Sequence, residues 1–358
     1  MSTLSTHHQI IRKDDLKYAL SATDGFIAEV SPGETFEVET KLNIGGHLIT
    51  QLDEKLDESK VKLPFVNPAT GPIRLRGAKP GDMVVIDVLE VGVHGLGYTA
   101  LWPGIGIFPD WVRKKEFAIQ NRNVVVENGI VHWSDSLKLE AKPMIGVIGV
   151  APVAGGTLTV DNGTHGGNLD IQEVTNGNRV MFPVFHEGAY LYFGDVHALQ
   201  GDAECNGMGA IEIRGHLKLK VDLVRAPSRM TWPRIETPTH ICTVGCARPL
   251  DDALRIAFEE MVYWLEEGYG IPGAEAYMLL GQIAQARCTQ MVNPKYTYIC
   301  KVEKSTYPSV EKMTPGGSWI SSRPSCPRYG AASSARRACE HGCVSFTARE
   351  CGRPGSGD

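Results

Sequence analysis

Basic residues are missing from the stretch of this chain where negative charge is densest. The segment GDVHALQGDAECNG, residues 194–207, holds three carboxylates and a histidine but no lysine or arginine. Carboxylates crowded in this way repel one another unless a cation, a proton or distant basic groups offset their charge. The neighbouring bulky residues Leu191, Tyr192, Phe193 and Leu199 predict partial burial, which makes unpaired charge more costly. The segment therefore favours a bound cation over a solvated acidic loop.

Long apolar runs are also missing. No stretch reaches the ~18 residues needed to span a membrane, and the opening MSTLSTHHQIIRKDD lacks the apolar core of a signal peptide. The net charge of -5 argues against nucleic acid or an anionic membrane as partner. With 42% hydrophobic and 22% charged residues, the 358-residue chain can bury a sizeable core. We expect a cytoplasmic protein with room for two domains or one large β-rich domain.

Cysteine is absent before Cys205, and four of the nine cysteines lie within residues 326–358. The odd total favours reduced thiols. Cys242 and Cys246 have no second pair at zinc-ligand spacing, so we expect no structural zinc there. Leucine is absent from Met313 onwards, where serine, arginine, glycine, proline and cysteine dominate. We expect residues 311–358 to form an atypical, disordered tail.

Helical periodicity is scarce in the first 230 residues, where short β patterns dominate. Strands are predicted within Asp82–Val93, Met144–Val160 and Ala210–Val224, and a hairpin around ENG within Asn123–Trp133. Many short strands without intervening helices are typical of a sandwich or barrel. We therefore predict an α+β, β-rich fold with a sandwich- or barrel-like β core.

A helical pair is predicted near the C-terminus. Apolar residues from Leu254 to Leu265 recur at helical spacing, with Gly268 placed just past the helix end. The segment PGAEAYMLLGQIAQARC predicts a second helix, and YTYICKVEK a closing strand. We expect a β-rich part over residues 1–160, and an α+β part over residues 161–310 that carries the site and both helices.

Three segments stand out as sites for chemistry. In the first, NPATGPIRLRGAKPGD at residues 67–82, we favour ordinary loop chemistry over a direct site role. The other two carry residues better suited to chemistry. Residues two apart on an extended chain share one side, so Asp195 would pair with His197, and Asp202 with Glu204. Asp-x-His on one face supplies an oxygen and a nitrogen ligand for a divalent ion, and Glu204 could add a ligand or act as a base. In THGGNLD, residues 164–170, the glycines could equally form a structural turn. That segment also carries a histidine, an amide and a carboxylate.

These segments resemble a known family. IGVIGVAP, THGGNLD and GAYLYFGDVHALQGDAECNGMGAIE closely resemble the boxes of the acetamidase/formamidase family, with similarity from about Asn67 to Lys304. The resemblance implies a cytoplasmic, homo-oligomeric enzyme that uses a divalent metal, zinc, to hydrolyse small aliphatic amides to carboxylate and ammonia. By position it implies these site residues: His165, Asn168, Asp170, Asp195, His197, Gln200, Asp202 and Glu204.

The resemblance and amide chemistry together suggest roles for these residues. We expect Asp170, Asp195, His197 and His165 to hold the metal, which activates water. Glu204 would be the general base that passes the water proton to the leaving nitrogen.

The remaining residues would support that step. Asn168 or Gln200 would donate a hydrogen bond to the oxyanion, and Asp202 would complete the catalytic set. Two departures from the family pattern lie beside the site: Ala203 replaces a glycine, and CNGMG is longer than expected.

Other functions remain open from the residues alone. A serine amidase would need a nucleophile motif such as G-x-S-x-G, which the chain lacks. A β-barrel metal oxygenase would use His-x-His rather than Asp-x-His, and carboxylate-rich ligands favour hydrolysis over redox iron. A non-catalytic calcium module would rarely include a histidine. Chelator sensitivity, oxygen consumption and calcium binding distinguish these alternatives.

Overall fold

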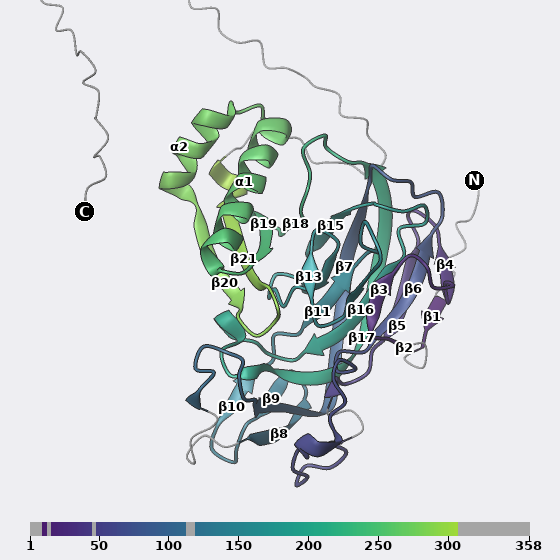
Figure 1. Ribbon diagram of the computed structural model, residues 1–358, viewed down its shortest axis with the longest axis vertical. Coiled ribbons are helices and arrows are strands. Elements are labelled where there is room, and N and C mark those ends of the chain that lie inside the picture. Colours follow the sequence, from purple (N-terminus) through teal and green to yellow (C-terminus); the bar gives the residue numbers. More distant parts are fainter. Residues whose placement is uncertain (1–8, 13–15, 45–47, 112–118, 307–358) are drawn as a thin grey trace, which may run out of the picture. The chain divides into compact units, whose positions relative to one another are not determined.

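A computed structural model describes residues 9–12, 16–44, 48–111 and 119–306. These residues form a large, mostly antiparallel sheet that curls on itself, with two helices near the end of the described chain (Figure 1). The predicted α+β, β-rich fold is thus confirmed. The tail predicted over residues 311–358 lies outside the described residues.

The strands are numerous and mostly short. Their bounds are β1 Gln9–Ile11, β2 Leu16–Lys17, β3 Ala19–Ser21, β4 Ala28–Val30, β5 Thr35–Glu39, β6 Ala69–Leu75, β7 Asp82–Leu101, β8 Gln120–Glu127, β9 Ile130–His132, β10 Lys138–Glu140, β11 Met144–Gly149, β12 Gly156–Leu158, β13 Asn162–Gly163, β14 Gly166–Asn168, β15 Arg179–Pro183, β16 Leu191–His197, β17 Gly207–Arg225, β18 Arg234–Glu236, β19 His240–Ala247, β20 Gln285–Gln290 and β21 Tyr296–Glu303. Among the described residues, only the pairs β1–β5 and β4–β6 are parallel. A separate small sheet pairs β3 with β12.

The two longest strands, β7 and β17, pair along most of their length, from Gly207 opposite Leu101 to Arg225 opposite Asp82. β16 pairs with β11, β6 and β17. Strands from both sides of residue 160 therefore share one sheet. The site segment in β16 has protein on all sides, because every residue of that strand is buried.

Alternation is clear where the sheet faces the core. In β17, Leu217, Leu219 and Val221 are fully buried, while Lys218 and Lys220 between them are partly exposed. This is the pattern expected of a strand with one face on a core. The predicted hairpin is also confirmed: β8 and β9 join through Asn128 and Gly129, both with positive φ, as a type I′ turn requires.

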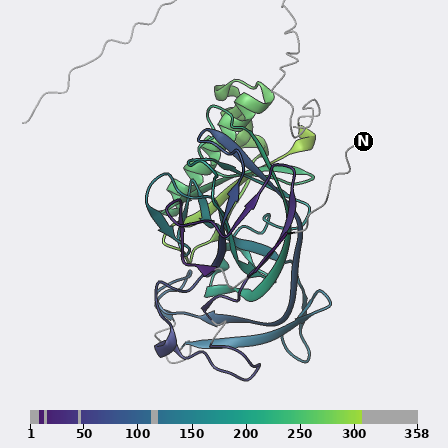
Figure 2. The same cartoon turned by 90° about the vertical axis from the view of Figure 1, so that its right-hand side faces the viewer.

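Helix α1, Leu250–Tyr269, packs against β19 and β21, and α2, Gly273–Ile283, follows it (Figures 1 and 2). A side chain at Gly245 of β19 would lie 2.1 Å from the carbonyl oxygen of Ala253, so this close approach requires glycine. The predicted helix end is wrong. Gly268 lies inside α1, and the helix ends at Gly270, whose φ of 69° suits glycine.

The second helix is shorter than predicted. It stops at Ile283, and the residues that follow form β20, which pairs with the predicted closing strand β21. Within the described ranges, no helix is both long and apolar enough to cross a membrane.

Candidate active site

The site is built around the end of β16. Asp195 has a φ of 51°, in the left-handed region, so this part of the strand is not regularly extended. The prediction that a regularly extended strand would place the side chains of Asp195 and His197 on one face is therefore wrong. The structure nonetheless brings the two side chains together, with Asp195 Oδ2 3.7 Å from His197 Nε2. Both residues are buried.

Two overlapping groups of ligand atoms meet at His197. The first comprises Asp170, Asp195 and His197, and the second His197, Glu204 and Glu212. Within each group the ligand atoms all lie within 4.8 Å of one another. All five residues are at most 4% exposed. The site thus joins four carboxylates and one imidazole in the protein interior, and we refer to these five residues as the acid–histidine centre.

One atom of each member of the centre has no hydrogen-bond partner among the described residues. These atoms are Asp170 Oδ1, Asp195 Oδ1, His197 Nε2, Glu204 Oε2 and Glu212 Oε2. A buried polar atom without a partner is costly and uncommon in folded proteins. Five such atoms lie in one centre, and two of them, His197 Nε2 and Glu212 Oε2, form an ion pair at 3.3 Å. A cation or shared protons would satisfy atoms of this kind.

Gln200 fixes the orientation of the imidazole. Its Nε2 donates to the carbonyl oxygens of Asp170, at 2.9 Å, and Thr289, at 3.0 Å. Its Oε1 lies 2.9 Å from His197 Nδ1 and can only accept, so Nδ1 carries the proton. His197 Nε2 is then the nitrogen that faces the carboxylates. This is the usual way in which a second residue prepares a histidine for a metal.

Two asparagines orient the carboxylates. Asn293 Nδ2 donates to Asp170 Oδ2 at 2.7 Å, and Asn67 Nδ2 donates to Asp195 Oδ2 at 2.8 Å. Asn293 Oδ1 also accepts from Asn168 Nδ2 at 3.0 Å. Each aspartate therefore has one oxygen held by an amide, while its other oxygen is the one without a partner.

The electrostatics of the centre are unusual. Burial raises the pKa of Asp170 to about 6 and that of Glu212 to about 7. Burial, reinforced by the charge of Asp170, raises the pKa of Glu204 well above its usual value. Burial opposes a charged imidazole, but Glu212 and Asp195 outweigh it and raise the pKa of His197. Without a cation, the centre thus retains protons near neutral pH.

The structure does not bring every predicted residue into the centre. His165 is buried, but it belongs to neither ligand group. The charges that act on it are those of Asp161 and Lys295, and burial lowers its pKa to about 4.

Asp202 lies outside the centre as well, and its side chain is 58% exposed and paired with Arg287. The expected alternation of Asp202 and Glu204 is wrong, because residues 202–204 form a 3-10 turn, η5. This turn sends Asp202 outward and buries Glu204.

Three contributors were missed in the sequence. Glu212 stands between Ile211 and Ile213 in an apolar strand, and a lone carboxylate in such a strand is the signal that could have found it. Asn67 opens the segment of residues 67–82, for which the loop interpretation was favoured over a site role, and Asn293 is an ordinary loop asparagine in sequence. Only the fold brings these two residues to the centre.

The residues present fit a divalent cation. Carboxylate oxygens and imidazole nitrogen are the ligands of catalytic zinc and related ions. Within the described part of the chain, His197 is the one basic group that forms ion pairs with the carboxylates of the centre. The atoms without partners and the excess of negative charge both call for a cation.

The fold and the centre define a β-rich protein with a buried acid–histidine centre. Comparisons with known proteins identify its family. The model of the Acetamidase/Formamidase family matches residues 25–155 and 153–300. The chain belongs to this family.

Named relatives include an acetamidase of Mycolicibacterium smegmatis, 30% identical over 55% of this chain and 63% of its own length. A formamidase of Methylophilus methylotrophus is 31% identical over 56% of this chain and 61% of its own length. The match therefore spans less than two thirds of these relatives. The crystal structure of an acetamidase from Bacillus halodurans superposes with a TM-score of 0.78 at 30% identity, covering 85% of this chain and 100% of that one.

Proposed function

We propose that this protein hydrolyses the carbon–nitrogen bond of small linear amides, releasing a carboxylate and ammonia. One observation carries the proposal: four buried carboxylates and one buried histidine, each with an atom that lacks a hydrogen bond among the described residues, form two overlapping ligand groups that share His197. The names of the relatives, acetamidase and formamidase, support the substrate class. The comparisons do not support the oxygenase and calcium-module alternatives.

In this proposal Asp170, Asp195 and His197 hold a divalent ion, with zinc as our candidate. When bound, such an ion would polarise the amide carbonyl and lower the pKa of water from 15.7 toward ~7. The protein contributes by holding the three side chains in place through Asn293, Asn67 and Gln200. Burial of the centre excludes bulk water and strengthens each electrostatic contact.

Glu204 is our candidate for the proton-transfer group. Its raised pKa allows the carboxyl to take a proton from the attacking water and deliver it to the departing nitrogen. The transfer matters because an amine leaves poorly from an amide unless it is protonated. Glu212, whose Oε2 lies 3.3 Å from His197 Nε2, would balance the charge of the centre and could serve as a further ligand.

The two amide side chains suggested as oxyanion donors differ in whether an N–H group remains available for the substrate. Gln200 uses both N–H bonds on backbone carbonyls, so we assign it to the orientation of His197 instead. Asn168 Nδ2 makes one hydrogen bond, to Asn293, and retains a second N–H. Asn168 is therefore our candidate donor to the oxyanion. A cytoplasmic location and a homo-oligomeric state are further parts of the proposal.

The test combines metal content with ammonia release. The full chain should bind a divalent ion, measured by mass spectrometry of the metal, and should release ammonia from formamide or acetamide. Asp195→Asn should lose both the metal and the activity, whereas Asp135→Asn, an exposed carboxylate, should keep both. Full metal content together with undiminished turnover in Asp195→Asn would overturn the ligand assignment. Turnover that survives complete metal removal would instead favour a serine mechanism.

A further inference from the structure

The short turn η5, Asp202–Glu204, decides where Glu204 points. Ala203 has a φ of 67° and Glu204 a φ of 45°, both in the left-handed region that non-glycine residues disfavour. A strained backbone of this kind persists only where the surroundings hold it. Glu204 therefore reaches the acid–histidine centre because other contacts stabilise the turn.

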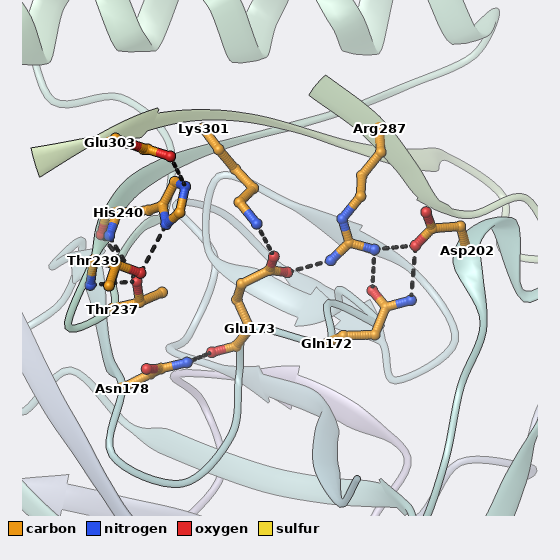
Figure 3. A network of polar contacts seen from close by, with 10 residues as sticks. All are labelled: Gln172, Glu173, Asn178, Asp202, Thr237, Thr239, His240, Arg287, Lys301 and Glu303. Atoms are coloured by element: carbon orange, nitrogen blue, oxygen red, sulfur yellow. Dashed lines mark hydrogen bonds and ion pairs between the residues drawn. The ribbon is translucent and has the colours of Figure 1, made fainter. Parts of the chain in front are cut away.

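Those contacts come from β20 and the residues just after it. The backbone N–H of Met291 donates to the carbonyl oxygen of Ala203 at 2.9 Å. The carboxylate of Asp202 accepts a hydrogen bond from Arg287 Nη1 and one from Gln172 Nε2, the latter at 3.3 Å (Figure 3). One bond thus holds the middle of the turn, and an ion pair holds its first residue.

Arg287 is itself held in place. Its Nη2 donates to Glu173 Oε2 at 2.5 Å and its Nη1 to Gln172 Oε1 at 3.0 Å (Figure 3). Glu173 also accepts from Lys301 Nζ at 2.9 Å. Two acids and two bases therefore balance in this network, in contrast to the uncompensated centre. The Arg287 side chain is only 23% exposed, and its guanidinium is held by hydrogen bonds to Glu173 and Gln172, so its planar fork presents a fixed partner to Asp202.

The segment that carries Arg287 also supports the rest of the centre. Thr289 accepts from Gln200, which orients His197, and Asn293 donates to Asp170. The strand β20 and the loop after it thus contact Asp170 of the centre, the Gln200 side chain that orients His197, and the turn that carries Glu204. Arg287 acts from this common support and not from a free surface loop.

We propose that Asp202 and Arg287 form a positioning pair that holds Glu204 in the acid–histidine centre. Neither residue needs to touch the substrate. The inference rests on the proposed function in so far as it assigns Glu204 the proton transfer. It differs from the role expected from sequence, because Asp202 acts through the turn and not as a catalytic group.

The first experiment uses Arg287→Met and Asp202→Asn, with Lys301→Met as the matched control. The control breaks the same network but makes no contact with Asp202. Both test variants should lower kcat for formamide by about 10- to 100-fold, the usual effect of a misplaced reacting group, with little change in KM or bound metal. Arg287→Lys should recover part of the loss. The control should keep wild-type kcat.

The second experiment separates positioning from general stability. In the metal-free protein, amide hydrogen exchange over residues 203–206 should speed up in both test variants and stay unchanged in Lys301→Met. The double variant Arg287→Met/Glu204→Gln should have nearly the same kcat as Glu204→Gln alone, because both changes remove the contribution of a correctly placed Glu204.

Several results would overturn the positioning pair. One is an Arg287→Met variant with unchanged hydrogen exchange and wild-type kcat. A second is a Lys301→Met control whose kcat falls as far as that of the test variants. A third is a double variant in which the two reductions of kcat multiply. A wild-type chain without amidase activity would refute the proposed function. The exchange measurement would then still decide whether the pair holds the turn.

Discussion

His197 Nε2 and Glu212 Oε2 lie 3.3 Å apart across the paired strands β16 and β17, where the two residues are direct partners in the register. Neither atom has a hydrogen-bond partner among the described residues. The strand pairing thus sets a carboxylate from the apolar stretch of β17 against the histidine of the acidic segment. It makes Glu212 part of the centre.

Replacing Glu212 by glutamine should weaken metal binding. The change keeps the shape of the side chain but removes one negative charge from a buried, cation-seeking centre. We expect the affinity for a divalent ion to fall about 10- to 100-fold, as for other residues that tune a metal site, with a matching loss of amide hydrolysis. Titration calorimetry of the metal-free protein measures the affinity. The control is Glu90→Gln, which changes an exposed carboxylate on β7. Equal affinities of the two variants for the divalent ion would exclude Glu212 from metal binding.

Gly146 leaves the room that two aspartates need. A Cβ at this position would lie 2.6 Å from both Asp170 Oδ1 and the Asp195 carbonyl oxygen. Gly146→Ala should therefore displace these aspartates and cost at least about 1 kcal/mol of stability, as overpacking of a dense interior does. Bound metal and turnover should fall together. Gly281→Ala, where a Cβ meets nothing within 4 Å, should retain both, and an active, metal-replete Gly146→Ala would contradict the geometry.

Ala203 stands in a conformation that suits glycine. Its φ of 67° strains an alanine. Ala203→Gly should raise the free energy of unfolding by up to ~1 kcal/mol, because relief of the left-handed strain outweighs the added freedom of the unfolded chain. Urea denaturation measures the difference. A less stable Ala203→Gly variant would show that the surroundings favour the methyl group over the relief of strain.

The metal-free protein should lose stability as the pH rises. Burial raises the pKa of Asp170 to about 6 and of Glu212 to about 7, from 3.8 and 4.5 respectively. The folded state therefore binds more protons than the unfolded state between these values. The stability that these protons contribute is complete below about pH 4 and lost as the pH rises through 6 to 7. Taken alone, each group would contribute roughly 3 kcal/mol, since one pKa unit is worth about 1.4 kcal/mol.

Urea denaturation in a chelating buffer from pH 4 to pH 8 measures this loss. Glu212→Gln should fall less steeply than the wild type, since its side chain no longer titrates. Added divalent metal should reduce the loss by replacing the protons. Identical slopes for the variant and the wild type would mean that Glu212 does not titrate in this range.

Local patterns predicted much of the secondary structure, because alternation and helical spacing are properties of neighbouring residues. The hairpin at Asn128 and Gly129 and the strand in Tyr296–Glu303 follow from such patterns. The failures have local causes as well. Helix α1 continues past Gly268 because its αL cap comes at Gly270. The side chains of Asp202 and Glu204 point in different directions because residues 203 and 204 adopt positive φ. The alternation rule holds only for an extended backbone with negative φ.

By itself, the sequence indicated the kind of chemistry: acids and a histidine crowded without basic residues must have their charge offset by a cation, by protons or by basic groups elsewhere in the chain. Only the tertiary structure decided which acids take part. It brought Glu212 to His197 through strand register and Asn293 to Asp170 across the fold, and it turned Asp202 outward to Arg287. The reason is physical, since composition sets the charge that must be balanced, whereas the distances between charges depend on contacts between residues far apart in the chain.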